Sequence, residues 1–278
     1  MGEKLDLERA WNEATSLLSA NRDVVLIVAA VFFFLPNVIS ALVLPSQDAF
    51  VMQMQALGDQ PDPQEVMALF ADHFAGSWWI YLIITLVQAV GMLGLLALLT
   101  DKSRPTVGEA LTFGGKALIP YIIAQILLGL AMVVPSILLI ALGAAINAAL
   151  AVIMVFVGIA LMVYIWVKLS LTSPVIAIEG IMNPINALTR SWRLTKGNSL
   201  RLFALYVLLI VAVVVLSLVA GLIFALFAVL GETIGLLVTA IGGGLISMVY
   251  TTIMLAVLAA VHRQLSGGST ARARETFE

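Results

Sequence analysis

The 278-residue sequence has no cysteine, only two histidines, and charged side chains at just 11% of its positions. Soluble globular domains carry about 25% charged residues, so this chain lacks the polar surface that a soluble fold requires. The absence of cysteine excludes disulfides, thiolate metal ligands and cysteine nucleophiles. His73 and His262 are too few, and too far apart in sequence, to indicate a histidine metal site.

Hydrophobic residues take the place of the missing charge. They make up 62% of the chain, and the mean hydropathy is +1.11. This composition excludes a soluble domain, a disordered chain and a nucleic-acid-binding protein. We therefore expect membrane lipids, and no nucleic acid, among the partners.

A membrane-crossing helix needs about 20 mostly apolar residues. Six stretches without Asp, Glu, Lys or Arg meet this requirement: 24–44, 78–99, 118–142, 148–167, 202–230 and 236–261. The sequence thus predicts an all-α polytopic membrane protein with six transmembrane helices, in a single integral membrane domain, 1–262, followed by a flexible cytoplasmic tail, 263–278. Short breaks at 143–147 and 231–235 predict tight turns between consecutive spans.

The 14 Lys and Arg residues all lie before the first span, between the second and third, between the fourth and fifth, or after the sixth. The segments on the opposite side contain none of them and hold these acids: Asp48, Asp59, Asp62, Glu65, Asp72 and Glu232. Because positive residues near spans stay in the cytoplasm, this distribution predicts that both termini are cytoplasmic.

Three segments on the predicted cytoplasmic side have the apolar spacing of interfacial amphipathic helices. Each starts with an N-cap residue that is followed four residues later by alanine: Asp6 and Ala10, Thr106 and Ala110, Asn183 and Ala187. Because each segment precedes two spans, the pattern predicts a threefold repeat of interfacial helix plus transmembrane hairpin. The alternative is that amphipathic helices commonly flank spans, and that so short a match arises by chance.

Two further segments are expected to be ordered. The outer loop, 45–77, contains two short amphipathic patterns and is interpreted either as a lid or docking surface, or as a helical hairpin resting on the leaflet or the bundle. Residues 171–184 are apolar but interrupted by prolines, so we expect them to dip under the bundle. Their one charge, Glu179, should pair with Arg190 or Arg193, because an unpaired carboxylate near lipid is costly.

Reactive groups are scarce. No span contains a carboxylate, and no metalloprotease, serine-hydrolase or P-loop motif occurs. We therefore expect no catalytic residue, no metal and no cofactor, in a protein that is not an enzyme. Gln88 and Gln125 are the costliest polar residues to place in hydrocarbon. Together with Tyr250 they either hydrogen-bond between helices or line an intramembrane cavity.

A cluster of cations follows the fourth span and is the best-defined candidate site. With a neighbouring tryptophan it predicts a site for anionic lipid headgroups, formed by Arg190, Trp192, Arg193, Lys196 and Arg201. The alternative is that these cations only set the topology, as in any inner loop.

Two stretches in this region carry a family resemblance. Residues 173–180 read Ser-Pro-Val-Ile-Ala-Ile-Glu-Gly, and residues 184–198 read Pro-Ile-Asn-Ala-Leu-Thr-Arg-Ser-Trp-Arg-Leu-Thr-Lys-Gly-Asn. Together with 5–10 and Asn21 they resemble a family of bacterial inner-membrane proteins labelled "glycerophosphoryl diester phosphodiesterase membrane domain", which includes the YciC-like proteins. The resemblance implies a six-span module of the inner membrane. In that family the phosphodiesterase is a separate soluble barrel, so no catalytic residue is transferred.

Two functions from different classes fit these features. One is a non-enzymatic, lipid-handling or transporter-like module in envelope homeostasis. The alternative is a structural or regulatory membrane protein that forms a homo-oligomer or scaffolds a partner. An intramembrane enzyme is a third hypothesis, which the lack of reactive groups disfavours.

The predicted sidedness is testable with single introduced cysteines, because the chain has no native thiol. In intact cells we expect Asp59→Cys to react with a membrane-impermeant maleimide. Ser269→Cys should react only after the cells are opened. The reverse pattern would place both termini outside, and labelling of both positions from one side would contradict an even number of spans.

Overall fold

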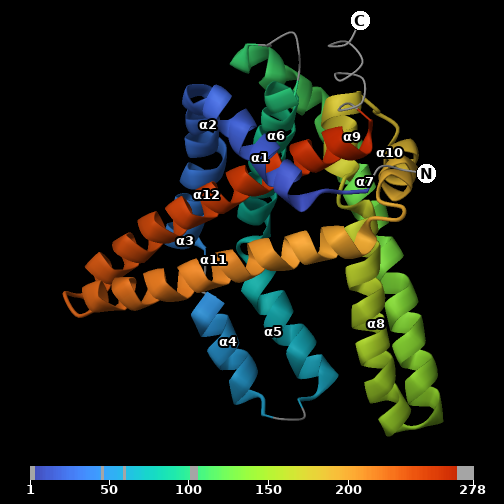
Figure 1. Ribbon diagram of the computed structural model, residues 1–278. Coiled ribbons are helices and arrows are strands. Elements are labelled where there is room, and N and C mark those ends of the chain that lie inside the picture. The colour runs from blue at the N-terminus through green and yellow to red at the C-terminus, as the bar shows by residue number, and fades with distance from the viewer. Residues whose placement is uncertain (1–3, 45–46, 59–60, 101–105, 268–278) are drawn as a thin grey trace, which may run out of the picture. The chain divides into compact units, whose positions relative to one another are not determined.

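The computed structural model describes residues 4–44, 47–58, 61–100 and 106–267. Every regular element in these ranges is helical (Figure 1): α1 (Leu7–Ala20), α2 (Arg22–Ala29), a π-helical turn (Ala30–Phe34), α3 (Leu35–Val43), α4 (Gln47–Ala56), α5 (Pro63–Ala75), α6 (Trp78–Thr100), α7 (Val107–Ile146), α8 (Ala148–Leu169), α9 (Thr172–Glu179), α10 (Pro184–Leu194), α11 (Ser199–Ala228) and α12 (Glu232–Leu265). Within them, six helical stretches are long and apolar enough to cross a membrane. This confirms the predicted all-α class with six transmembrane helices.

The helices form two compact units. The first comprises Met1–Val25, Met92–Val211 and Ile253–Glu278, and the second comprises Leu26–Gly91 and Ala212–Thr252. All 14 Lys and Arg residues of the sequence belong to the first unit, and the charged residues of the second are all acids. The predicted single membrane domain, 1–262, stays a prediction.

The core of the first unit is built mainly from helix ends. Leu95 and Leu96 near the end of α6, Ile176 of α9 and Leu202 at the start of α11 are all 0% exposed. Val257 of α12 is also 0% exposed. The part of the α7–α8 hairpin nearest its turn at Asn147, in contrast, exposes long apolar side chains, as expected of helices that face lipid.

The predicted N-caps are present. The Asp6 carboxylate accepts the N–H of Arg9 at 3.0 Å, and the Asn183 side chain accepts the N–H of Asn186 at 3.1 Å. Thr106 forms the full capping box with Glu109. These side chains satisfy backbone donors that the start of a helix leaves unpaired.

Small residues follow each cap at matched positions. The fourth and eighth positions after the cap are buried in all three helices, and they hold Ala10 and Ala14, Ala110 and Gly114, Ala187 and Ser191. The shared spacing supports the predicted threefold repeat. The internal symmetry itself stays a prediction.

Two boundaries around α7 differ from the prediction. The third span and the interfacial helix expected before it form one continuous helix, α7. The turn predicted over 143–147 shrinks to Asn147 alone, whose side chain accepts the N–H of Leu150 at 2.8 Å and so starts α8. Gly143 permits this close return, because a Cβ there would lie 3.0 Å from the Leu150 carbonyl oxygen.

Two other segments are more helical than the sequence predicts. Within 171–184 the buried helix α9 forms, because Pro174 stands in its first turn, where a missing N–H costs no hydrogen bond. Gly180 then ends α9 with a φ of 68°, a left-handed conformation that favours glycine. The tail predicted to start at 263 is wrong over its first residues, since α12 continues to Leu265. Residues 268–278 lie outside the described part of the chain.

In the second unit, the outer loop forms two helices, α4 and α5, as predicted. The Phe50 ring of α4 lies 5.1 Å from that of Phe70 and 4.5 Å from that of His73, measured between centroids. Asp62 caps α5 by accepting the N–H of Gln64 at 2.8 Å. The loop is therefore an aromatic-packed helical hairpin, and its role as a lid or docking surface stays a hypothesis.

The same unit contains a close contact that only glycine allows. A Cβ added to Gly91 of α6 would lie 2.3 Å from the Cβ of Phe32. Because the Phe32 Cβ is fixed to the backbone, no rotation of that side chain relieves the clash. The two backbones must separate if Gly91 is replaced.

We expect Gly91→Ala to destabilise the purified protein by about 1–3 kcal/mol through overpacking, measured as a lower midpoint of thermal unfolding. Gly221→Ala is the control, because a Cβ at Gly221 meets nothing within 4 Å. Alanine in that helix should be neutral or stabilising by up to about 1 kcal/mol. Equal midpoints for the two variants would contradict the packing of α6.

Candidate functional site

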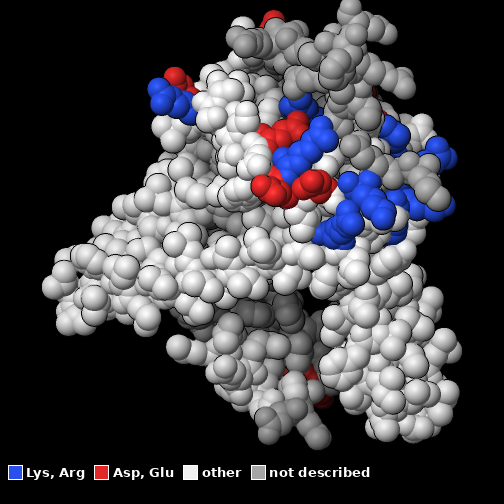
Figure 2. Space-filling model, viewed as in Figure 1, with Lys and Arg blue, Asp and Glu red and all other residues white. Residues whose placement is uncertain are grey.

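The predicted headgroup site lies on α10, the turn after it and the start of α11. Figure 2 shows Lys and Arg side chains (blue) gathered over these elements, whereas the far ends of α7 and α8 are uncharged (white). The helix α10 starts where the sequence predicts, because Asn183 caps it and Pro184 occupies its first position. The contacts of each cation decide which ones remain available to a ligand.

Arg190 is occupied by an internal partner. Its guanidinium donates to both carboxylate oxygens of Glu179, through Nε at 2.9 Å to Oε2 and through Nη2 at 3.0 Å to Oε1. This confirms that Glu179 pairs with Arg190. A second partner was not expected from the sequence: Nε2 of His262 lies 2.9 Å from Oε1 of Glu179. The carboxylate thereby joins α9, α10 and α12.

Arg201 is also occupied. Its Nη1 donates to the carbonyl oxygen of Leu5 at 2.7 Å. The Leu5 N–H donates in turn to the side-chain oxygen of Asn198 at 2.8 Å. These two hydrogen bonds hold the segment before α1 against the start of α11. Arg201 therefore contributes to the packing of the N-terminal segment.

Arg193 and Lys196 differ from these two arginines. Both are exposed, and neither has an ion-pair partner among the described residues. Trp192 lies beside them with 40% of its surface exposed. Of the predicted site, Arg193, Lys196 and Trp192 have no internal ion-pair partner among the described residues, Arg190 is neutralised by Glu179, and Arg201 is exposed with one donor bonded to Leu5.

Lys168 adds a cation whose place in the sequence indicates only a topology-setting charge. It lies in the last turn of α8 and is 5% exposed. Its Nζ lies 5.8 Å from the Tyr164 ring centroid and 5.3 Å from that of Trp192. The spacing of Tyr164 and Lys168 was the available signal, because residues four apart share a helix face.

The backbone at Lys168 holds α10 against α8. Its carbonyl oxygen accepts hydrogen bonds from the hydroxyls of Ser191 at 3.0 Å and Thr195 at 3.1 Å. Both hydroxyl residues are 0% exposed. The relative position of Lys168 and Trp192 is thus fixed by buried hydrogen bonds.

A cavity of about 180 Å³ opens between α6, α7, α8, α9 and α12 within the first unit. Apolar side chains form much of its wall, and its polar lining consists of Tyr121, Gln125, Ser170, Thr172 and Ser173. Gln125 donates a hydrogen bond to the Tyr121 hydroxyl. The structure therefore places Gln125, one of the three predicted cavity residues, at a cavity.

Gln88 and Tyr250, the other two predicted cavity residues, belong to the second unit. Gln88 lies on α6 and Tyr250 on α12, and both are half-buried. A shared cavity with Gln125 stays a prediction.

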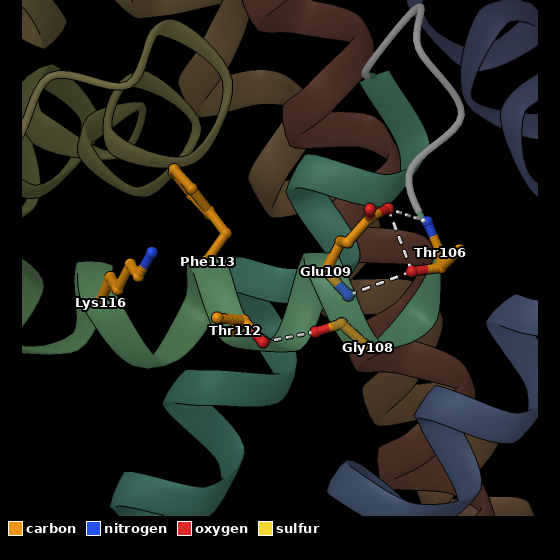
Figure 3. A pocket seen from close by; sticks show the side chains of 6 residues that line it. All are labelled: Thr106, Gly108, Glu109, Thr112, Phe113 and Lys116. Atoms are coloured by element: carbon orange, nitrogen blue, oxygen red, sulfur yellow. Dashed lines mark hydrogen bonds between the residues drawn. The ribbon is translucent and has the colours of Figure 1, made fainter.

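A shallow groove along the first turns of α7 has fewer side chains free to bind a ligand than the cation cluster of α10 (Figure 3). Thr106, Glu109 and Lys116 line it, and the Glu109 carboxylate accepts the Thr106 N–H at 2.8 Å. Its acid is thus committed to capping the helix. We assign no ligand to this groove.

No group of three or more His, Asp or Glu residues that could hold a metal ion occurs in the described ranges. Comparison with protein-family models, with curated proteins and with solved structures found no match to this chain.

The two arginines of α10 give a matched test of the pairing. We expect Arg190→Gln to destabilise the protein by about 1–3 kcal/mol, because it removes a charged donor from the partly buried Glu179 carboxylate. Arg193→Gln, three residues along the same helix, should change stability by less than about 0.5 kcal/mol. Thermal unfolding of both variants in the same detergent measures the difference, and equal shifts would contradict the assignment.

Proposed function

We propose that this membrane protein is a non-enzymatic, lipid-handling or transporter-like module that binds anionic lipid headgroups on α10. The observation that carries the proposal is the division among its cations. Arg190 is paired with Glu179 and Arg201 is bonded to the Leu5 carbonyl, whereas Arg193 and Lys196 are exposed without an ion-pair partner among the described residues.

The surface around these cations has the character of a membrane interface. Ile185 and Trp192 of α10 are 63% and 40% exposed, on a helix that also carries Arg193. Tryptophan is enriched at the headgroup level of membranes, where its ring and its N–H both find partners. A helix with exposed apolar and cationic side chains binds anionic membranes through both.

The cavity at Gln125 supports lipid handling rather than headgroup binding alone. Its wall combines apolar side chains with hydroxyl and amide groups, as sites for amphipathic molecules do. Its volume of about 180 Å³ would accommodate part of a lipid.

We also propose a bacterial inner-membrane location, with both termini cytoplasmic. The confinement of all 14 Lys and Arg residues to one unit supports a single basic side. The resemblance of residues 173–180 and 184–198 to the "glycerophosphoryl diester phosphodiesterase membrane domain" family supports the same location.

A second function, a structural or regulatory module that self-associates, rests on a different observation. Ala141, Ala145 and Ala149 on the α7–α8 hairpin are exposed. Small residues on a lipid-facing surface allow helices of two molecules to approach closely. This module would not discriminate between lipid headgroups.

The proposal is tested by replacing the two unpartnered cations. We expect Arg193→Gln with Lys196→Gln to weaken binding to phosphatidylglycerol vesicles by about 2 kcal/mol, roughly 30-fold, because each cation near the surface contributes about 1 kcal/mol. Binding to neutral phosphatidylcholine vesicles should not change. Flotation of the protein, reconstituted in nanodiscs, with each type of vesicle measures both.

Lys116→Gln serves as the control, because Lys116 is an exposed lysine of α7 outside the proposed site. It should leave binding to both vesicles unchanged. Equal binding of the unaltered protein to neutral and anionic vesicles would overturn the proposal and favour the second function.

A further inference from the structure

Lys168 is a buried cation without an anion. Its residue is 5% exposed, and no carboxylate of the described residues pairs with it. Its ammonium donates to no oxygen in that part of the chain either. Most of the residue is withdrawn from water, so an anion from outside the chain would stabilise the ammonium.

The neighbouring aromatic rings do not supply that partner. Tyr164 and Trp192 meet edge to face, with centroids 5.9 Å apart at 87°, and they flank the ammonium. Cation–π contacts compensate only part of the hydration that a buried ammonium loses. The two rings instead pack against each other beside the Lys168 ammonium.

The direction of the side chain argues against a helix-capping role. Lysines in the last turn of a helix commonly approach the final carbonyl groups. The Lys168 ammonium instead lies over Tyr164, four residues earlier, and so points back along α8. The ammonium therefore lies level with the last turn of the predicted span, 148–167, at the inner edge of the membrane.

The ammonium remains open to a ligand. In the described ranges, the one fully enclosed polar side-chain atom without a hydrogen-bond partner is Nδ1 of His262. The Lys168 Nζ, which also lacks a partner, therefore retains accessible surface. Lys196 directly follows Thr195, whose hydroxyl donates to the Lys168 carbonyl oxygen at 3.1 Å. The two lysines therefore belong to one patch of positive charge, and an anion between them would compensate both charges.

We propose that Lys168 and Lys196, against the Trp192 ring, form a site for the phosphomonoester headgroup of an anionic lipid. The proposal rests on the proposed lipid-binding function and adds the class of headgroup. A phosphomonoester carries between one and two negative charges at neutral pH, whereas the phosphodiester of phosphatidylglycerol carries one. Two lysines that repel each other therefore favour the monoester.

The test compares dioctanoyl phosphatidic acid, phosphatidylglycerol and phosphatidylcholine by titration calorimetry of the purified chain in a neutral detergent. We expect Lys168→Met to weaken phosphatidic acid binding about tenfold, and phosphatidylglycerol binding less than about threefold. Lys168→Arg, which keeps the charge, should stay within about threefold of the unaltered protein. Lys116→Gln should change neither affinity.

Folding of each variant is checked by its unfolding midpoint. Should Lys168→Met fail to fold, Lys196→Gln replaces it, because Lys196 is exposed and its loss should also lower the preference for phosphatidic acid. Unchanged phosphatidic acid binding in these variants would overturn the inference.

Two further outcomes are separable. If the unaltered protein binds anionic and neutral lipids equally, the proposed function fails as well. If it binds both anionic lipids equally and Lys168→Met has no effect, only the inference fails. Displacement of phosphatidic acid by an equal concentration of glycerol 3-phosphate would assign the site to a soluble phosphomonoester and overturn the lipid as its source.

Discussion

A half-buried carboxylate at the end of α9 holds three helices of the first unit together. Glu179 accepts hydrogen bonds from Arg190 of α10 and lies 2.9 Å from Nε2 of His262 on α12. A carboxylate removed from water requires such partners, because its lost hydration is otherwise uncompensated. Helices that contribute one partner each are thereby held together, and the surface that carries the free cations keeps a fixed shape.

The pairing at Glu179 also determines which cations face outward. Arg190 turns toward the carboxylate, so Arg193 of α10 and Lys196 of the turn after it are the neighbouring cations without an ion-pair partner among the described residues. Lys168 adds a third charge from α8, positioned by the hydroxyls of Ser191 and Thr195. The candidate site is thus a product of several helices rather than of one basic loop.

Much of this architecture is predictable from the sequence because it depends on local chemistry. Uncharged stretches of bilayer length predict the spans, and Asp6, Thr106 and Asn183 predict helix starts through their side-chain oxygens. The contacts of His262 with Glu179 and of Lys168 with Trp192 are not predictable in this way, since they join residues distant in sequence. The helix α9 within residues 171–184 was not predicted for another reason. A proline interrupts a helix interior but is tolerated in a first turn, where Pro174 stands.

The single-residue connection at Asn147 has a consequence for biogenesis. In the proposed orientation, the α7–α8 hairpin passes no charged side chain across the bilayer, because residues 118–167 contain none. It can enter the lipid from the ribosome side as a preformed pair of helices, with no charged side chain to dehydrate. The first hairpin has to translocate the acidic α4–α5 segment. Insertion machinery is therefore needed most at the beginning of synthesis.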